Sequence, residues 1–158
     1  MRIFVPMGDR RVAQGEGTLS ITGLGSCVAI VLYDEGTRVG GLAHVLLPDP
    51  SFSQRERCWL FVTEAIPALL DELEEAGAER SRLTARLVGG AAMFQELSPQ
   101  DRPNMGRRNV SAAREMLARV GIPVVAEDVG GEFGRSMDFD LSNGRIQISS
   151  QGKSRGEI

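Results

Sequence analysis

Apolar patterns in the first third of the chain predict a group of β-strands. Residues 3–5 form a short apolar segment, and Leu19 and Ile21 alternate with polar neighbours, as in a strand with one buried face. The polar stretch 8–17 between them carries no strand signal. Residues 27–33 are continuously apolar, which is typical of a strand covered on both faces. A turn at residues 34–37 and a returning strand at 39–47 complete a predicted hairpin.

A helix is predicted after this hairpin, because apolar residues recur there at the helical period. Gly77 marks its expected end. Proline is compatible with a helix only in the first turn, so Pro67 places the expected start near Thr63. The apolar face of this helix consists of Val62, Ile66, Leu69, Leu73 and Ala76.

The remaining sequence predicts one more helix and further strands. Val110, Ala113, Leu117 and Val120 mark the second helix, with Asn109 or Ser111 as its N-cap. Strands are expected at residues 83–88, from residue 124 onward, and as a hairpin at 137–141 and 146–148. Many strands with two separated helices indicate the α+β class, here a single domain with a layered, mixed β-sheet flanked by helices. We assign residues 1–149 to this domain and expect the polar tail 150–158 to fray.

Composition narrows the functional classes. The 158 residues suit one domain, and a net charge of -3 argues against a nucleic-acid binder that works by bulk charge. The sequence lacks the long apolar run of a membrane span, and its N-terminus lacks the apolar core of a signal peptide. A cytoplasmic location follows as an expectation, and it suits two reduced cysteines.

The predicted hairpin brings the single histidine close to a cysteine. If the turn is centred between Glu35 and Gly36, Cys27 lies directly opposite His44. Directly opposed residues have Cβ atoms about 4.5–5.5 Å apart, so a thiol there reaches an imidazole. A register shift of one residue would instead turn His44 to the other face of the sheet.

A cysteine beside a histidine suits nucleophilic chemistry. The imidazole takes the thiol proton and returns a proton to the leaving group. Gly23 and Gly25 allow the backbone to turn, so that the N–H groups of Ser26 and Cys27 point at a developing oxyanion. The reaction class that follows is acyl transfer through a thioester, from an amide or an ester.

Simpler interpretations stand beside this one. A cysteine in an apolar strand is often a small core residue, and a lone histidine is often structural. Cys58, beside Trp59, is interpreted as a core or surface residue. A zinc site made from Cys27, His44 and Cys58 is disfavoured because the ligands have no paired spacing. We therefore expect no metal and no cofactor.

Two further features stay open at this stage. Gly130 and Gly131 suit either an anion-binding nest or a turn between strands. Arg107 and Arg108 precede the N-terminus of the second predicted helix, where the helix dipole disfavours cations. They therefore serve either a partner surface or a solvated loop.

Short blocks of sequence carry a resemblance that spans nearly the whole chain. The blocks are LGSCVA at residues 24–29, GLAHVLLP at 41–48, GGAAMF at 89–94, GRRNV at 106–110, DVGGEFGR at 128–135 and FDL at 139–141. With them the chain resembles the CheD family of bacterial chemoreceptor glutamine deamidases. The first block and the downstream Ala-His pair are its specific part.

The resemblance implies a fold similar to the catalytic domain of cytotoxic necrotizing factor toxins. It implies hydrolysis of glutamine side-chain amides on the cytoplasmic helices of chemoreceptors, which gives glutamate and ammonia. Cys27 is then the nucleophile and His44 the base. The resemblance further implies a CheC-type phosphatase as a partner that occludes the active site.

One position departs from the family pattern. Relatives often carry a threonine that helps to orient the histidine, and this chain has Ile21 there, followed by Thr22. Neighbouring side chains on a strand point to opposite faces, so Thr22 takes this role only if a bulge near Gly23 re-aims it. Otherwise a backbone carbonyl or another residue must orient His44. The departure favours the alternative of a non-catalytic adaptor that docks on receptor helices or a phosphatase. A cysteine protease or transglutaminase is a third, less favoured alternative, because thioester chemistry alone does not exclude amine acceptors in place of water.

Overall fold

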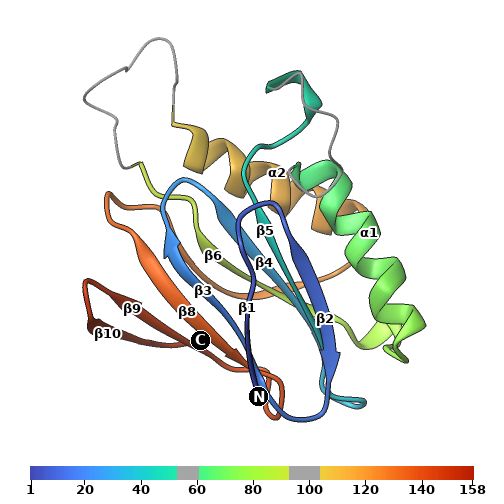
Figure 1. Cartoon of the computed structure of the whole chain (residues 1–158). Coiled ribbons are helices and arrows are strands. Elements are labelled where there is room, and N and C mark those ends of the chain that lie inside the picture. The colour runs from blue at the N-terminus through green and yellow to red at the C-terminus, as the bar shows by residue number, and fades with distance from the viewer. Residues whose placement is uncertain (53–60, 93–103) are drawn as a thin grey trace.

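The computed structural model describes residues 1–52, 61–92 and 104–158, which form two five-stranded β-sheets and two α-helices (Figure 1). One sheet has the strand order β1-β3-β8-β9-β10, and the other has the order β2-β5-β4-β6-β7. The strands are β1 Arg2–Phe4, β2 Arg10–Gln14, β3 Thr18–Leu24, β4 Val28–Asp34, β5 Val39–Val45, β6 Thr84–Gly89, β7 Val124–Val129, β8 Arg135–Asp140, β9 Ile146–Ser150 and β10 Lys153–Glu157. The helices are α1 Val62–Glu75 and α2 Met105–Arg119, with short 3-10 turns at Pro50–Phe52 and Arg80–Arg82.

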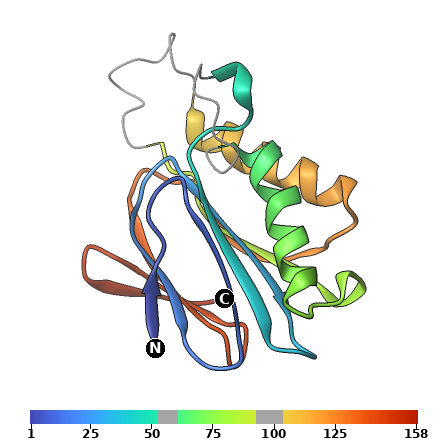
Figure 2. The ribbon, with the colours of Figure 1, turned by 45° about the vertical axis from the view of Figure 1, so that its right-hand side comes forward.

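The elements stack in three layers. Figures 1 and 2 show α1 and α2 together on one side of the molecule, with β9 and β10 at the far side. The central strand β4 is buried along its whole length and contributes to two cores. Ile30 and Leu32 pack with the helices, whereas Val31 and Tyr33 pack with the other sheet. This confirms the predicted α+β class and the prediction that this apolar run is covered on both faces.

The helices occur where the periodicity predicts them, but their beginnings differ in detail. α1 begins at Val62, and Pro67 lies beyond its first turn, so the expectation for that proline was wrong. α2 begins at Met105, and its N-cap is Asn104, whose side chain accepts a hydrogen bond from the N–H of Arg107. The predicted cap at Asn109 or Ser111 was therefore wrong. The helix extends further toward the N-terminus than its apolar residues indicate, so Arg107 and Arg108 lie in its first turn and not before it, contrary to expectation.

Two strands escaped prediction because both lie at sheet edges and are largely polar. β2 pairs antiparallel with β5 inside the stretch that carried no strand signal. β10 pairs antiparallel with β9, and every residue of β10 is exposed. The side chain of Glu157 in β10 accepts a hydrogen bond from Arg145 Nη1 at 2.7 Å. The expectation that this tail frays was therefore wrong, since backbone pairing needs no apolar side chain.

Among the described residues, no helix combines the length and the apolar composition that crossing a membrane requires.

Candidate active site

The β4–β5 hairpin has a register that differs from the predicted one. Ala29 pairs with His44, and Asp34 pairs with Val39, so Asp34 belongs to the strand and the loop is residues 35–38, centred one residue later than assumed. The prediction that Cys27 lies directly opposite His44 was therefore wrong. The pairing moved by two positions, however, and a shift of two keeps a side chain on its face. His44 is thus a diagonal neighbour of Cys27 on the same side of the sheet.

Both side chains face the layer between the two sheets. Cys27 packs there with Ala29 and Val31, while Ala43 and Val45 on β5 face the helices. Since side chains alternate along a strand, His44 lies on the side opposite to Ala43 and Val45. Cys27 is 5% exposed and His44 is 4% exposed. The hairpin therefore places a thiol and an imidazole on the same face of the sheet in a mostly buried setting.

A backbone carbonyl orients the imidazole. Nδ1 of His44 lies 3.1 Å from the carbonyl oxygen of Val5. A carbonyl only accepts hydrogen bonds, so this contact requires Nδ1 to carry a proton, and the neutral ring then leaves Nε2 as the acceptor. Nε2 is buried and has no hydrogen-bond partner among the described residues. The basic nitrogen is thus free to take a proton.

The backbone of His44 is also fixed by the N-terminal segment. The N–H of Gly8 donates to the carbonyl of His44 at 2.9 Å, and the N–H of His44 donates to the carbonyl of Asp9 at 2.9 Å. The segment that supplies the Val5 carbonyl therefore holds both the ring and the main chain of this residue.

Thr22 is exposed in the structure, and Ile21 is buried in the core at 2% exposure. The β3–β8 pairing does contain an irregularity between Ile21 and Leu24, where Gly23 has a φ of 76°. This bulge leaves the side chain of Thr22 at the surface. Nδ1 of His44 instead bonds to a backbone carbonyl, that of Val5. A backbone carbonyl was the alternative to Thr22 that the sequence left open.

The loop before Cys27 has its carbonyl groups anchored on one side. A trans peptide is planar, with its C=O and N–H pointing in opposite directions, and the described chain has no cis peptide. Anchoring the carbonyls therefore directs the N–H groups of Ser26 and Cys27 away from the anchoring groups. The anchoring bonds run from Ala91 N to Gly25 O at 2.9 Å, from Asn109 Nδ2 to Ser26 O at 2.9 Å and from Gly90 N to Cys27 O at 2.8 Å.

Glycines make this anchoring possible by close backbone approach. A Cβ atom on Gly89 would lie 2.4 Å from the carbonyl oxygen of Cys27, and one on Gly106 would lie 2.4 Å from the carbonyl oxygen of Ala91. Real side chains do not tolerate such contacts. Any other residue at either position would therefore push the loop or α2 away from the site.

Two contributors to the site were not predicted from the sequence: the Val5 carbonyl and the Asn109 side chain. Val5 gave no signal because its contribution comes from the main chain. Asn109 did give one, since it shares a helix face with Ala113 and Leu117, where an apolar residue is the norm. A polar residue on a buried helix face predicts a hydrogen-bonding role.

Comparison with known proteins assigns the family. The family model for CheD chemotactic sensory transduction matches residues 46–150, which is well over half of the chain. The chain belongs to the CheD family. The matched segment begins after His44, but whole-chain relatives extend across the hairpin.

Three of these relatives show the extent of the similarity. The chain is 42% identical to a "Probable chemoreceptor glutamine deamidase CheD" of Desulforamulus reducens, over 95% of this chain and 91% of the relative. It is 45% identical to a protein of the same name from Pyrococcus abyssi, over 92% of this chain and 90% of the relative. It is 38% identical to the "Chemoreceptor glutamine deamidase CheD" of Halalkalibacterium halodurans, over 99% and 98%. The resemblance to the CheD family is confirmed; the comparison with the toxin domain stays a prediction.

In this member of the CheD family, burial sets the resting protonation of both groups. Burial raises the pKa of Cys27 to about 11, and the N–H of Cys27 itself offsets part of that rise. Burial also lowers the pKa of His44, against the hydrogen bond to Val5. The unliganded pair is therefore a neutral thiol and a neutral imidazole near pH 7.

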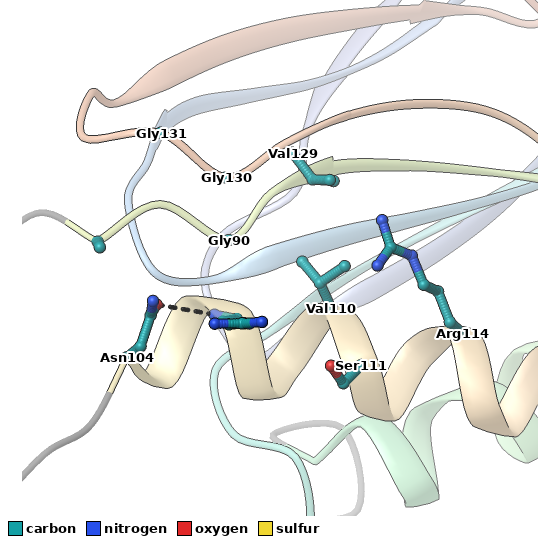
Figure 3. A pocket seen from close by; sticks show the side chains of 10 residues that line it. Gly90, Asn104, Val110, Ser111, Arg114, Val129, Gly130 and Gly131 are labelled. Carbon is teal, nitrogen blue, oxygen red and sulfur yellow. Dashed lines mark hydrogen bonds between the residues drawn. The ribbon is translucent and has the colours of Figure 1, made fainter.

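A pocket of about 350 Å³ adjoins the anchored loop (Figure 3). It combines the two features that the sequence left open, because Arg107 and the Gly130–Gly131 turn both line it. Cys27 and His44 are not among its lining residues. Its walls are formed by Gly90, Ala92, Asn104, Arg107, Val110, Ser111, Arg114, Val129, Gly130 and Gly131.

The remaining candidate, Cys58, lies outside the described residues. Within the described part of the chain, no group of three His, Cys, Asp or Glu side chains is placed to hold a metal ion.

Proposed function

We propose that this protein hydrolyses the side-chain amide of glutamines on chemoreceptors, with Cys27 as the nucleophile and His44 as the general base. The observation that carries the proposal is the state of His44: Val5 holds Nδ1, and the buried Nε2 has no hydrogen-bond partner among the described residues. The printed names of the relatives support the substrate class.

The first half of the reaction forms a thioester. The sulfur of Cys27 attacks the carboxamide carbon of the substrate while its proton passes to Nε2 of His44. The carbonyl oxygen becomes an oxyanion, which the N–H groups of Ser26 and Cys27 are directed to stabilise. The bond between carbon and nitrogen then breaks, and the imidazolium gives its proton to the departing nitrogen, which leaves as ammonia.

The second half consumes one water. Nε2 of His44 takes a proton from the water as its oxygen attacks the thioester carbon. The bond between carbon and sulfur breaks, and the sulfur takes the proton back from His44. The new carboxyl group then loses its remaining proton to solvent, which gives glutamate. The enzyme returns to its starting protonation state.

The raised pKa of Cys27 determines how the attack begins. A thiol with a pKa of about 11 is almost entirely protonated at neutral pH. The reaction therefore uses general-base removal of the thiol proton during attack instead of a thiolate that is present beforehand. This makes the free Nε2 of His44 essential to the first step.

Mass spectrometry of a receptor cytoplasmic fragment tests the proposal. The fragment is incubated with wild type, with Cys27→Ala and with Cys58→Ala, which keeps Cys27 as the one remaining cysteine. We expect conversion of glutamine to glutamate with wild type and Cys58→Ala, and none with Cys27→Ala. Conversion by Cys27→Ala would contradict the covalent route.

The same experiment decides between the proposal and its alternatives. Binding of the cognate fragment by wild type without any conversion would favour the non-catalytic adaptor. Adding a primary amine to the assay detects transglutaminase chemistry, because an amine adduct then replaces part of the glutamate.

The partner and the location complete the proposal. The family resemblance supports a CheC-type phosphatase that covers the active site, and its addition is then expected to slow deamidation. A cytoplasmic location fits a nucleophilic thiol that must stay reduced and a substrate on the cytoplasmic part of a receptor.

A further inference from the structure

We infer that Asn109 is the positioning residue of this active site, because its side-chain amide fixes the nucleophile loop against the end of the strand that carries His44. The inference rests on the proposed roles of Cys27 and His44 and adds the group that sets their relative placement. Asn109 is a residue of α2 and is fully buried.

One nitrogen atom makes both contacts. Nδ2 of Asn109 donates to the carbonyl oxygen of Ser26 at 2.9 Å and to the carbonyl oxygen of Leu46 at 2.9 Å. Ser26 directly precedes Cys27, and Leu46 follows His44 closely on the chain. Both acceptors are carbonyls, so only the NH₂ side of the amide fits there, and the orientation of the side chain is fixed by chemistry.

The contacts occur where the backbone ladder ends. The β4–β5 pairing stops at Val28 and Val45, and continuing its register would pair Cys27 with Leu46. The backbone pairing of the two strands ends at that point, and the amide of Asn109 connects the residues that follow through its two hydrogen bonds. Next to the nucleophile, hydrogen bonds from the Asn109 side chain therefore replace the backbone hydrogen bonds between the two strands.

The bond to Ser26 also sets the direction of a proposed oxyanion donor. Ser26 C=O and Cys27 N–H belong to one planar peptide, so holding the carbonyl toward α2 turns the N–H the other way. An Asn109 side chain that loses this bond frees the peptide to rotate. The developing oxyanion would then lose a donor fixed in advance.

The helix that carries Asn109 is itself held close to the loop. A Cβ atom on Gly106 would lie 2.4 Å from the carbonyl oxygen of Gly90, and one on Gly90 would lie 2.4 Å from Cγ2 of Val110. Figure 3 shows Val110 on the side of α2 that faces Gly90. The amide therefore starts from a backbone position with little freedom to move.

Only one of the two polar atoms of the Asn109 side chain is hydrogen-bonded within the described part of the chain. Oδ1 of Asn109 is buried and has no hydrogen-bond partner among the described residues. An unpaired buried acceptor destabilises a fold, whereas an apolar residue of similar size would avoid that cost. The two donated bonds are what an apolar residue could not supply.

Steady-state kinetics on the receptor fragment test the inference with matched variants. Asn109→Ala removes both donors, Asn109→Ser keeps one shorter donor, and Leu117→Ala opens a cavity at a fully buried position further along the same helix. We expect Asn109→Ala to lower kcat about 10- to 100-fold with KM within about threefold of wild type. The kcat of Asn109→Ser is expected to lie between that of Asn109→Ala and that of wild type.

Leu117→Ala separates positioning from stability. Below its unfolding midpoint it is expected to keep kcat within about threefold of wild type. An equal loss of kcat in Leu117→Ala and Asn109→Ala at equal stability would overturn the inference, and so would a wild-type kcat in Asn109→Ala. If Asn109→Ala does not fold, a wild-type kcat in Asn109→Ser overturns it.

Amide hydrogen exchange gives a readout that does not need deamidase activity. The N–H groups of Gly90 and Ala91 donate to the anchored loop, so their exchange reports its opening. We expect faster exchange at both in Asn109→Ala and unchanged exchange in Leu117→Ala. Should wild type deamidate nothing, the proposed function fails, and exchange still decides whether Asn109 holds the loop: unchanged exchange in Asn109→Ala would refute it.

Discussion

The two ends of strand β4 each bury a titratable side chain, and the fold treats them in opposite ways. At the end of the strand, Asp34 is fully buried and accepts hydrogen bonds from four donors: Gly36 N at 2.9 Å, Glu79 N at 2.8 Å, Arg82 Nε at 2.9 Å and Arg82 Nη2 at 3.0 Å. The Arg82 guanidinium holds the pKa of Asp34 well below its usual range. Asp34 is thus a satisfied charge.

At the other end, Cys27 and His44 are almost as buried, and within the described part of the chain no opposite charge contributes to the pKa of either group. Burial raises the pKa of Cys27 and lowers that of His44. The Nε2 atom of His44 has no partner among the described residues. The hydrogen-bonded carboxylate of Asp34 stabilises the fold, whereas the thiol and imidazole with shifted pKa values fit the catalytic roles proposed for Cys27 and His44. The difference supports a structural role for one end of the strand and the proposed chemistry for the other.

The largest expected difference between the two ends of β4 is in the effect of substitutions on kcat. Removing the general base in His44→Gln is expected to lower kcat by about 10²- to 10⁴-fold, because the neutral thiol then loses its proton acceptor. Asp34→Ala, assayed below its unfolding midpoint, is expected to keep kcat within about threefold of wild type. Steady-state rates on the receptor fragment measure both. A large kcat loss in Asp34→Ala at full foldedness would break the comparison.

The next effect is on stability at the Asp34 end. Asp34→Ala leaves two backbone N–H groups and the Arg82 guanidinium without their acceptor, and we expect a loss of about 2–4 kcal/mol in the free energy of unfolding. Urea titration measures it. Asp140 offers a matched control: its carboxylate accepts from the N–H of Ser142 at 2.8 Å and from its hydroxyl at 2.6 Å, both without a cation. Asp140→Ala should cost about 1 kcal/mol, and an equal loss in both variants would remove the distinction.

The hairpin shows how far sequence alone reaches. The continuous apolar run predicted β4 and its burial on both faces, and the returning strand and the shared face of Cys27 and His44 followed. The register did not, because Asp34 is a typical turn residue, whereas in the structure it pairs with Val39 and its carboxylate accepts hydrogen bonds from Glu79 and Arg82. Glu79 and Arg82 are distant from Asp34 in the sequence, so no local sequence pattern predicts their hydrogen bonds to it.

The contributors to the site divide in the same way. Cys27 and the glycine blocks are visible in the sequence as residue types at set spacings. The Val5 carbonyl cannot be predicted from residue type because every residue has a carbonyl, and its contact with His44 depends on the path of the segment that follows β1. Asn109 has a readable polar side chain on an apolar helix face, but its acceptors at Ser26 and Leu46 come from the tertiary fold alone.

A smaller effect sharpens the comparison through pH. His44 is the only histidine, and its pKa in the folded protein lies below its ordinary value of 6.5. The unfolded chain therefore binds a proton that the folded chain resists, and stability falls as pH drops below about 6.5. Asp34 behaves differently: its folded pKa is lowered from 3.8, so its contribution persists above about pH 4 and is lost only as pH falls toward the folded value.

Urea midpoints measured across the acid range test this order of events. The slope due to His44 cannot exceed about 1.4 kcal/mol per pH unit, the value for one proton. His44→Gln should flatten the curve between about pH 6.5 and pH 5, and Asp34→Ala should flatten it below about pH 4. A wild-type slope that survives in His44→Gln would mean that another group titrates there, and the description of His44 as buried and neutral would be wrong.

The smallest expected effect concerns the position where the chain departs from its relatives. Thr22 is exposed, and the Val5 carbonyl already holds Nδ1 of His44, so Thr22→Ala should leave kcat within about twofold of wild type. Ile21→Thr introduces the threonine that the family resemblance leads us to expect, but it places a hydroxyl in a site that is 2% exposed. We expect it to lower the free energy of unfolding by about 1–3 kcal/mol without raising kcat. A marked rise in kcat would show that the Val5 carbonyl orients the imidazole less well than a side-chain hydroxyl, and that the bond at Nδ1 limits the rate.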